Sequence, residues 1–195
     1  LAKLETIDHD IITQMINNDL INAHRANALS PAQPVLRGSS QNPDVYFQAR
    51  ESVNPYYQKM PGIMQQTMDH FAQLSDRQYH LFDYIGATDA QKIIILMGSS
   101  AETVHETVDY LQTQNEKVGV IKVRLYRPLD SAALLQAIPQ SVKAIAVLDR
   151  TKEPGSDGEP LYKDVVTTIA MQLNDEQARF KTMPTIVGGR YGLSS

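Results

Sequence analysis

The chain has 195 residues, enough for one domain with an extension or for two small domains, and its hydrophobic content of 42% is ordinary for a globular protein. Its net charge of −4 argues against nucleic acid or an anionic membrane as the main partner, because both are bound through basic surfaces. It contains no cysteine, which excludes disulfides and cysteine-bound zinc or iron–sulfur clusters from these residues.

Residues 1–85 indicate a helix- and loop-rich extension. The segment 8–29 predicts one or two helices, and residues 30–57, with four prolines, predict mostly loop with room for a short strand at 44–48. Residues 62–76 predict a further helix. The apolar side chains expected on inward or shared helix faces are Ile12, Met15, Ile16, Leu20, Ile63, Phe71 and Leu74. Because a loop of about 28 residues is unusual inside a compact domain, we expect this region to pack on a neighbouring domain.

Residues 86–195 alternate between short apolar runs and helical patterns. Strands are predicted at 91–98, 117–126, 141–149 and 182–190. Helices are predicted at 99–114, 129–139 and 161–173. This order predicts an α/β domain of three layers, with a parallel or mostly parallel sheet and helices on both faces.

The junction MGSSAETV (97–104) joins a predicted strand to a predicted helix. The free backbone N–H groups of the helix start at Ser99 and Ser100 could hold a phosphate or carboxylate. A simpler interpretation is a capping box, with Ser99 as N-cap and Glu102 three residues later, and the two roles are compatible. No glycine-rich nucleotide-binding motif is present at this junction.

Two further segments follow strands and carry charge. The first, DRTKEPGSDGE, includes Arg150, Lys152 and Glu153, and is either a solvated loop or a loop that faces a partner or ligand. The second, VGGRYGLSS, places Arg190 and Tyr191 after a glycine pair, where they could grip an anion or another domain, or form a plain turn. None of the five histidines has the spacing of a helical metal pair, and no esterase-type nucleophile motif occurs.

Several segments resemble one known family, in the order in which that family carries them. They are AHRANALSP, VLRGSSQNPDVYFQARE, NPYY, VGVIKVRLYRPLD, AIAVLDRTKEPGSDGEPLYKDV and GGRYGLSS, and they are similar to segments of pyruvate:ferredoxin (flavodoxin) oxidoreductase. The resemblance covers nearly the whole chain. It implies that residues 1–85 are the tail of a thiamine-enzyme-like domain and that 86–195 are an α/β domain similar to the C-terminal domain of transketolase.

The resemblance also implies the nature of the whole enzyme, a large cytoplasmic homodimer with thiamine diphosphate, Mg²⁺ and 4Fe–4S clusters. Such an enzyme oxidatively decarboxylates pyruvate, makes acetyl-CoA and reduces ferredoxin or flavodoxin. The family's cysteine clusters and Mg²⁺–diphosphate motif have no counterpart here, so no catalytic, cofactor-binding or metal-binding residue is carried over. We therefore expect an inactive piece that binds no cofactor, contacts other domains of the same polypeptide, and uses Arg150, Lys152 and Glu153 for interdomain contacts.

Two other functions remain open on the sequence. One is a free-standing module that binds a small anion or nucleotide at Ser99 and Ser100. The other is a pure interaction domain. A chain that begins at Leu1 without an initiator methionine, and shows no signal-peptide pattern or membrane span, is expected to be a cut piece of a cytoplasmic protein.

Overall fold

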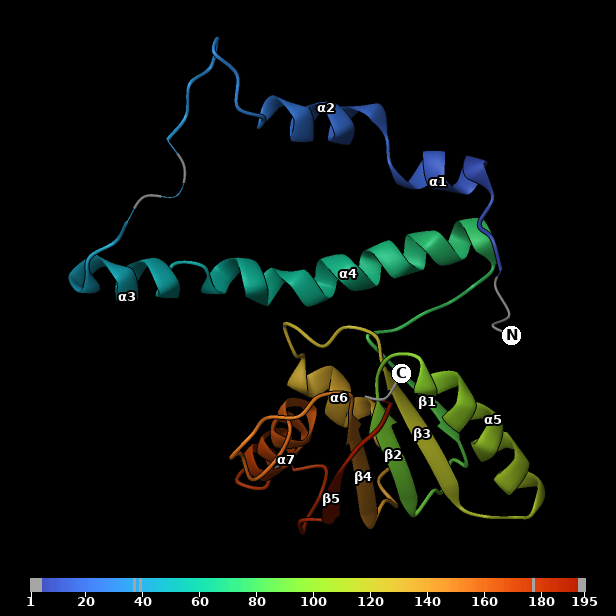
Figure 1. Ribbon diagram of the computed structural model, residues 1–195. Coiled ribbons are helices and arrows are strands. Elements are labelled where there is room, and N and C mark those ends of the chain that lie inside the picture. The colour runs from blue at the N-terminus through green and yellow to red at the C-terminus, as the bar shows by residue number, and fades with distance from the viewer. Residues whose placement is uncertain (1–4, 37, 39, 177, 193–195) are drawn as a thin grey trace. The chain divides into compact units, whose positions relative to one another are not determined.

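The computed structural model describes residues 5–36, 38, 40–176 and 178–192. Contacts between residues divide the chain into two compact units, Leu1–Tyr79 and His80–Ser195. Figure 1 shows that the first unit is helical and that the second is built on a sheet.

Four helices make up the described part of the first unit. They are α1 (His9–Met15), α2 (Asn18–Ala26), α3 (Pro43–Glu51) and α4 (Asn54–Ser75). The two helices predicted within 8–29 are confirmed, and each starts with a local cap: Asp8 accepts from the backbone N–H of Asp10, and Asn17 from that of Leu20. None of the described residues of this unit is buried.

Three predictions for this unit are wrong. Residues 44–48 lie in helix α3 rather than in a strand, because Pro43 supplies a preset first helical position that outweighs the β propensity of the valine and aromatic residues after it. Helix α4 begins at Asn54, so most of the second half of the predicted loop is helical. Ile63 is 55% exposed rather than inward-facing, whereas Phe71 is partly buried and stacks on Tyr79 with ring centroids 6.0 Å apart.

The second unit contains a five-stranded sheet with the order β1-β3-β2-β4-β5. The four predicted strands are confirmed as β2 (Lys92–Leu96), β3 (Val118–Val123), β4 (Ala144–Asp149) and β5 (Thr185–Arg190), all paired in parallel. An edge strand not predicted from the sequence, β1 (Phe82–Gly86), pairs antiparallel with β3. The α/β fold with a mostly parallel sheet is therefore as expected.

Helices cover both faces of this sheet. Helix α5 (Ser100–Thr113) packs on β3 and β1, while α6 (Ser131–Ala137) and α7 (Pro160–Gln172) lie on the opposite face (Figure 1). The strands carry apolar residues on both faces, as expected for a parallel sheet buried on both sides. The largest fully buried side chains are Ile95, Leu96, Ile121, Leu134, Ile138, Ile145, Leu161, Ile169, Val120, Val147 and Val165.

Parallel pairing brings the carboxyl ends of β2, β4 and β5 to the same end of the sheet, which we call its carboxyl edge to distinguish it from the edge strands. Met97, Arg150 and Tyr191 are the first residues after these three strands. Every predicted site residue of the second unit thus lies at or just beyond this edge, which is where open α/β sheets meet their ligands and partners.

Candidate functional site

Strand β4 ends in a buried carboxylate that caps the next helix. Asp149 is 4% exposed, and its two oxygens accept hydrogen bonds from the backbone N–H groups of Leu161 (2.9 Å) and Tyr162 (3.1 Å) in the first turn of α7. Those N–H groups have no partner inside the helix, so the carboxylate stabilises the helix start. Burial raises the pKa of the Asp149 carboxyl above its ordinary value; the two backbone hydrogen bonds oppose the shift and the charges of Glu159 and Asp164 add to it.

A second buried carboxylate, Glu159, organises the loop between β4 and α7. It is 5% exposed, and it accepts hydrogen bonds from the backbone N–H of Glu153 (2.7 Å) and from Arg190 Nη1 (2.5 Å). Lys152 Nζ lies 3.7 Å from the same carboxylate. Burial pushes the pKa of Glu159 upward, but the Arg190 and backbone hydrogen bonds and the two positive charges outweigh it, so the pKa lies below its ordinary value.

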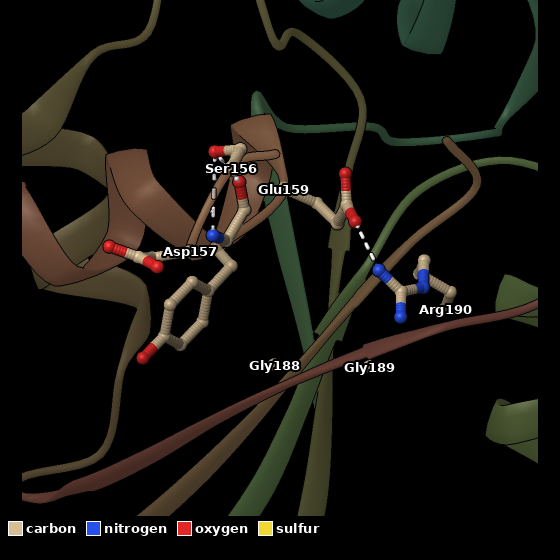
Figure 2. Close-up of a pocket in the computed structure, with 8 residues that line it drawn as sticks. Ser156, Asp157, Glu159, Gly188, Gly189 and Arg190 are labelled. Atoms are coloured by element: carbon tan, nitrogen blue, oxygen red, sulfur yellow. Dashed lines mark hydrogen bonds and ion pairs between the residues drawn. The ribbon is translucent and has the colours of Figure 1, made fainter. Parts of the chain in front are cut away.

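A cavity of about 210 Å³ lies beside this carboxylate. Figure 2 shows Glu159 and Arg190 pointing toward one another next to Gly188 and Gly189 of β5. The cavity is lined by Ser156, Asp157, Gly158, Glu159, Tyr162, Gly188, Gly189 and Arg190.

Two glycines make room for the ring of Tyr162 in this wall. A Cβ atom built at Gly158 would lie 2.5 Å from Tyr162 Cδ1, and one built at Gly188 would lie 3.1 Å from the same ring. Ser156 Oγ, which donates to the carbonyl oxygen of Gly158 over 2.8 Å, holds the turn in place. Gly158 of the loop and Gly188 of β5 therefore allow the loop, helix α7 and strand β5 to pack closely around the Tyr162 ring.

The remaining predicted residues meet between the ends of β2 and β4. The connections from β2 and β4 leave in opposite directions, so the crevice between these strands is the position where doubly wound sheets bind ligands. Here it is bridged by the chain itself. Arg150 donates from Nε to the carbonyl oxygen of Gly192 and from Nη1 to Ser99 Oγ, both over 3.2 Å, and the Tyr191 hydroxyl donates to the carbonyl oxygen of Met97.

The structure thus brings most of the predicted residues together in two neighbouring groups. Ser99, Arg150 and Tyr191 form the crevice group, and Lys152, Glu153 and Arg190 surround Glu159. Glu153 also pairs with Lys163 Nζ over 2.6 Å. Ser100 is the first residue of α5.

The predicted capping box is wrong. Ser99 has helical backbone angles and makes no side-chain cap, and its hydroxyl accepts from Arg150 instead. The carboxylate of Glu102 is held by Lys122, whose Nζ lies 2.8 Å from both of its oxygens. Lys122 is only 5% exposed, and a buried ammonium needs a counter-charge more than an exposed helix start needs a cap.

Sequence reasoning missed the central roles of Asp149 and Glu159. The available signal was Pro160, which marks the first position of a helix and so places Glu159 at the cap and Asp149 at the end of the preceding strand. The pairing partners themselves carry no sequence signal, because they depend on which strand ends become neighbours.

Metal ions and iron–sulfur clusters require a set of ligating side chains that lie close together. No group of three His, Asp or Glu side chains that could hold a metal ion occurs in the described part of the chain, and the sequence has no cysteine. A cysteine-ligated iron–sulfur cluster therefore cannot be held by these residues. Among residues with described positions, no helix is long and apolar enough to cross a membrane.

The second unit is an α/β domain whose strand-end polar groups bind one another. Two family models match the chain: "Pyruvate:ferredoxin oxidoreductase core domain II" over residues 90–191, in the second unit, and "Pyruvate flavodoxin/ferredoxin oxidoreductase, thiamine diP-bdg" over residues 1–69, in the first. The chain belongs to the pyruvate:ferredoxin/flavodoxin oxidoreductase family, which confirms the resemblance seen in the sequence.

Individual relatives show how much of the family's length this chain represents. It is 58% identical to a pyruvate-flavodoxin oxidoreductase of Trichormus variabilis and 51% identical to a pyruvate:ferredoxin oxidoreductase of Moorella thermoacetica. Each match covers 100% of this chain but only 16% of the relative, so the chain corresponds to a small part of large proteins. A solved 2-oxoglutarate:ferredoxin oxidoreductase from Magnetococcus marinus matches 68% of this chain and 20% of its own, at 16% identity and a TM-score of 0.39, a likeness that carries no further conclusion.

Proposed function

We propose that residues 1–195 are a structural, interdomain segment of a thiamine diphosphate-dependent 2-oxoacid oxidoreductase. The names of the relatives support an enzyme that oxidises pyruvate and reduces ferredoxin or flavodoxin. That the reaction is an oxidative decarboxylation to acetyl-CoA, and that the enzyme is a cytoplasmic homodimer, are part of this proposal. Residues 1–85 would be the tail of its thiamine-binding domain, and residues 86–195 would form the next domain. The segment itself would bind no cofactor and would touch neither pyruvate nor the electron carrier.

The observation that carries this proposal is the mutual pairing of the strand-end polar groups. A general acid or base must reach the proton that it transfers, yet Glu159 is enclosed by Arg190, Lys152 and a backbone N–H. Arg150 and Tyr191 likewise donate hydrogen bonds to groups just beyond neighbouring strands. These contacts brace the edge of the sheet, which suits a scaffold better than a catalytic centre.

The braced edge also supports a role in domain contacts. The paired side chains of Lys152, Glu153, Lys163 and Arg190 each keep 43–48% of their surface exposed. Charges that are already held in place lose little conformational entropy when another surface binds them, and they favour a partner of complementary charge. We expect this edge, with Arg150, Lys152 and Glu153, to face another domain of the same polypeptide.

The test is a charge reversal, Lys152→Glu, in the full-length enzyme. We expect lower yields of assembled enzyme or slower pyruvate-dependent dye reduction, with the KM for pyruvate unchanged because the edge does not touch substrate. Lys181→Glu, an exposed lysine in the loop before β5, is the matched control and should behave as the parent. A Lys152→Glu enzyme with parental assembly and turnover would contradict the interdomain role.

A second arm of the test separates the alternatives. The 195-residue chain is titrated with thiamine diphosphate, coenzyme A and a nucleotide, and we expect no saturable binding. Micromolar binding that is lost on changing Ser99 and Ser100 would favour an anion- or nucleotide-binding module. An intact native gene product of only this length would overturn the idea of a segment, and would favour an interaction domain if no ligand bound.

A further inference from the structure

An apolar groove lies on the sheet face that carries α5. Its volume is about 310 Å³, and it extends from Val104 and Leu111 of α5 across Ile94 and Ala146 to Val187 of β5. Only Lys92, Thr107 and Thr185 add polar atoms to a lining that is otherwise aliphatic or glycine. We call this surface the open groove.

The topology of the sheet explains why the groove is open. The connection from β2 to β3 runs toward one edge of the sheet, whereas those from β3 to β4 and from β4 to β5 run toward the other. Right-handed crossovers then place α5 on one face and α6 and α7 on the opposite face, as Figure 1 shows. No connection within the described ranges returns over β4 and β5, so their face on the side of α5 has no helix of its own.

The exposure of this face is unusual for a parallel sheet. Parallel strands are almost always covered on both sides, yet Val187 is 55% exposed and Ile94, Ala144 and Ala146 are only partly buried. The two alanines are paired with Lys92 and Ile94 of β2 on one side and with Thr185 and Val187 of β5 on the other. Their small side chains leave a shallow channel along β4 between larger neighbours, which lets a backbone approach closely.

We propose that an amphipathic helix, from the part of the longer polypeptide outside residues 1–195, packs into the open groove. Strands β2, β4 and β5 together span two inter-strand spacings, roughly 10 Å, which matches the diameter of one helix. The relatives are about six times longer than this chain, since it covers 16% of their length, so ample polypeptide exists to supply the helix. An acidic side chain or the carboxyl end of the helix is expected beside Lys92 at the groove's end.

The dimensions of the groove favour one helix over a second copy of the chain. A stable protein–protein interface usually involves about 20–30 residues on each partner, more than the residues that line this groove. A helix carried by the same polypeptide needs much less area, because its effective concentration is already high. The proposal requires only that the chain is part of a longer polypeptide, so it can fail without affecting the proposed function of the strand-end edge.

Photo-crosslinking in the full-length enzyme tests this proposal. A benzophenone amino acid replaces Val187, the native protein is irradiated, and crosslinked peptides are identified by mass spectrometry on a mixture of light- and heavy-isotope protein. We expect crosslinks within one molecule to a single peptide outside residues 1–195, with attachment points three or four residues apart. The same variant irradiated in denaturant is the control, and it should lose these crosslinks.

Three results would overturn the proposal: crosslinks only within residues 1–195, crosslinks between light and heavy molecules, or no peptide adduct. The probe placed at Met171, an exposed residue of α7 on the opposite face, should not reach the same peptide. Ala146→Leu fills the channel and should reduce the Val187 crosslink severalfold, whereas Ala146→Gly should leave it. An unchanged yield with leucine would show that no helix lies over β4.

Discussion

Helices in both units of this chain carry apolar side chains, but in the described part of the chain such side chains are buried only in the second unit. Among the residues that the structure describes, the buried hydrophobic side chains all lie between Leu81 and Phe180, in the second unit. The described residues of the first unit include none, although its helices carry apolar side chains such as Ile12, Leu20 and Ile63. An apolar helix face is therefore a requirement for a core but does not by itself create one.

The first unit is held together by local caps and by a few long-range contacts, such as those of α1 with α4 and the ion pair between Arg77 and Glu5 (3.4 Å). Helices α1 and α2 have 7 and 9 residues, and helices this short are marginally stable in water without tertiary packing. Their caps at Asp8 and Asn17 use neighbouring backbone groups only. The match of residues 1–69 to a thiamine-binding domain model is consistent with a unit that completes its packing against the remainder of that domain. We expect its stability to depend on polypeptide outside this chain.

The largest predicted effect sharpens this comparison directly. Ile95→Ala removes a fully buried side chain from the centre of the sheet and should lower the free energy of unfolding of the 195-residue chain by about 2–5 kcal/mol. Ile63→Ala, the same change on the exposed face of α4, should alter it by less than about 0.5 kcal/mol. Urea denaturation followed by circular dichroism measures both. Equal losses would show that the first unit has a core of its own.

A smaller effect is expected at the end of β4. Asp149→Ala removes both acceptors at the start of α7 and should destabilise the second unit by about 1–3 kcal/mol, because two backbone N–H groups lose their partner. Asp149→Asn keeps one acceptor and should cost less. Thermal unfolding near neutral pH measures both variants.

The pH dependence of this residue gives an independent readout. Since burial raises the pKa of Asp149 in the folded state, the protonation-linked part of its contribution is complete below the ordinary value of 3.8 and is lost as the pH rises through the folded-state pKa. The hydrogen bonds that its two oxygens accept from α7 remain above that pH. Asp149→Asn should remove that loss, so the stability difference between the two proteins should narrow as the pH rises through this range. A constant difference across the range would contradict the assignment.

Much of the sheet could be predicted from the sequence because parallel strands buried on both faces are continuous apolar runs. KIIIL and AIAVLD have this pattern, and they form β2 and β4. Strand β1 was missed because Asp83 interrupts its apolar run and Gly86 ends it early. Helix α3 was missed because the valine and aromatic residues after Asp44 have strong strand propensity, which the Asn42–Pro43 start signal outweighs.

The candidate site was predictable in its location but not in its contacts. Parallel pairing alone places the carboxyl ends of β4 and β5 at the same edge, which is why Arg150, just after β4, and Arg190, at the end of β5, could be named in advance. The choice of Glu159 as the shared carboxylate, and of Lys122 as the partner of Glu102, depends on burial and on contacts between residues far apart in the chain. No local pattern carries that information.

The smallest predicted effect lies at the Lys122–Glu102 pair, which joins α5 to β3. Glu102→Gln should lower stability by about 1 kcal/mol at neutral pH: Lys122 is buried and loses its counter-charge, but the Glu102 side chain is 71% exposed and water screens the pair. Because the hydrogen bond from Lys122 holds the pKa of Glu102 below its ordinary value of 4.5, the contribution is present above that pH and is lost as the pH falls through the folded-state pKa. Thermal unfolding at pH 7 and at pH 3 should therefore show a stability difference between the parent chain and Glu102→Gln that is smaller at pH 3.

Glu106→Gln, an exposed change one turn along the same helix, is the matched control, and its stability should differ little from that of the parent at either pH. A Glu102→Gln deficit that persisted unchanged at pH 3 would mean that the side chain acts through packing rather than through its charge.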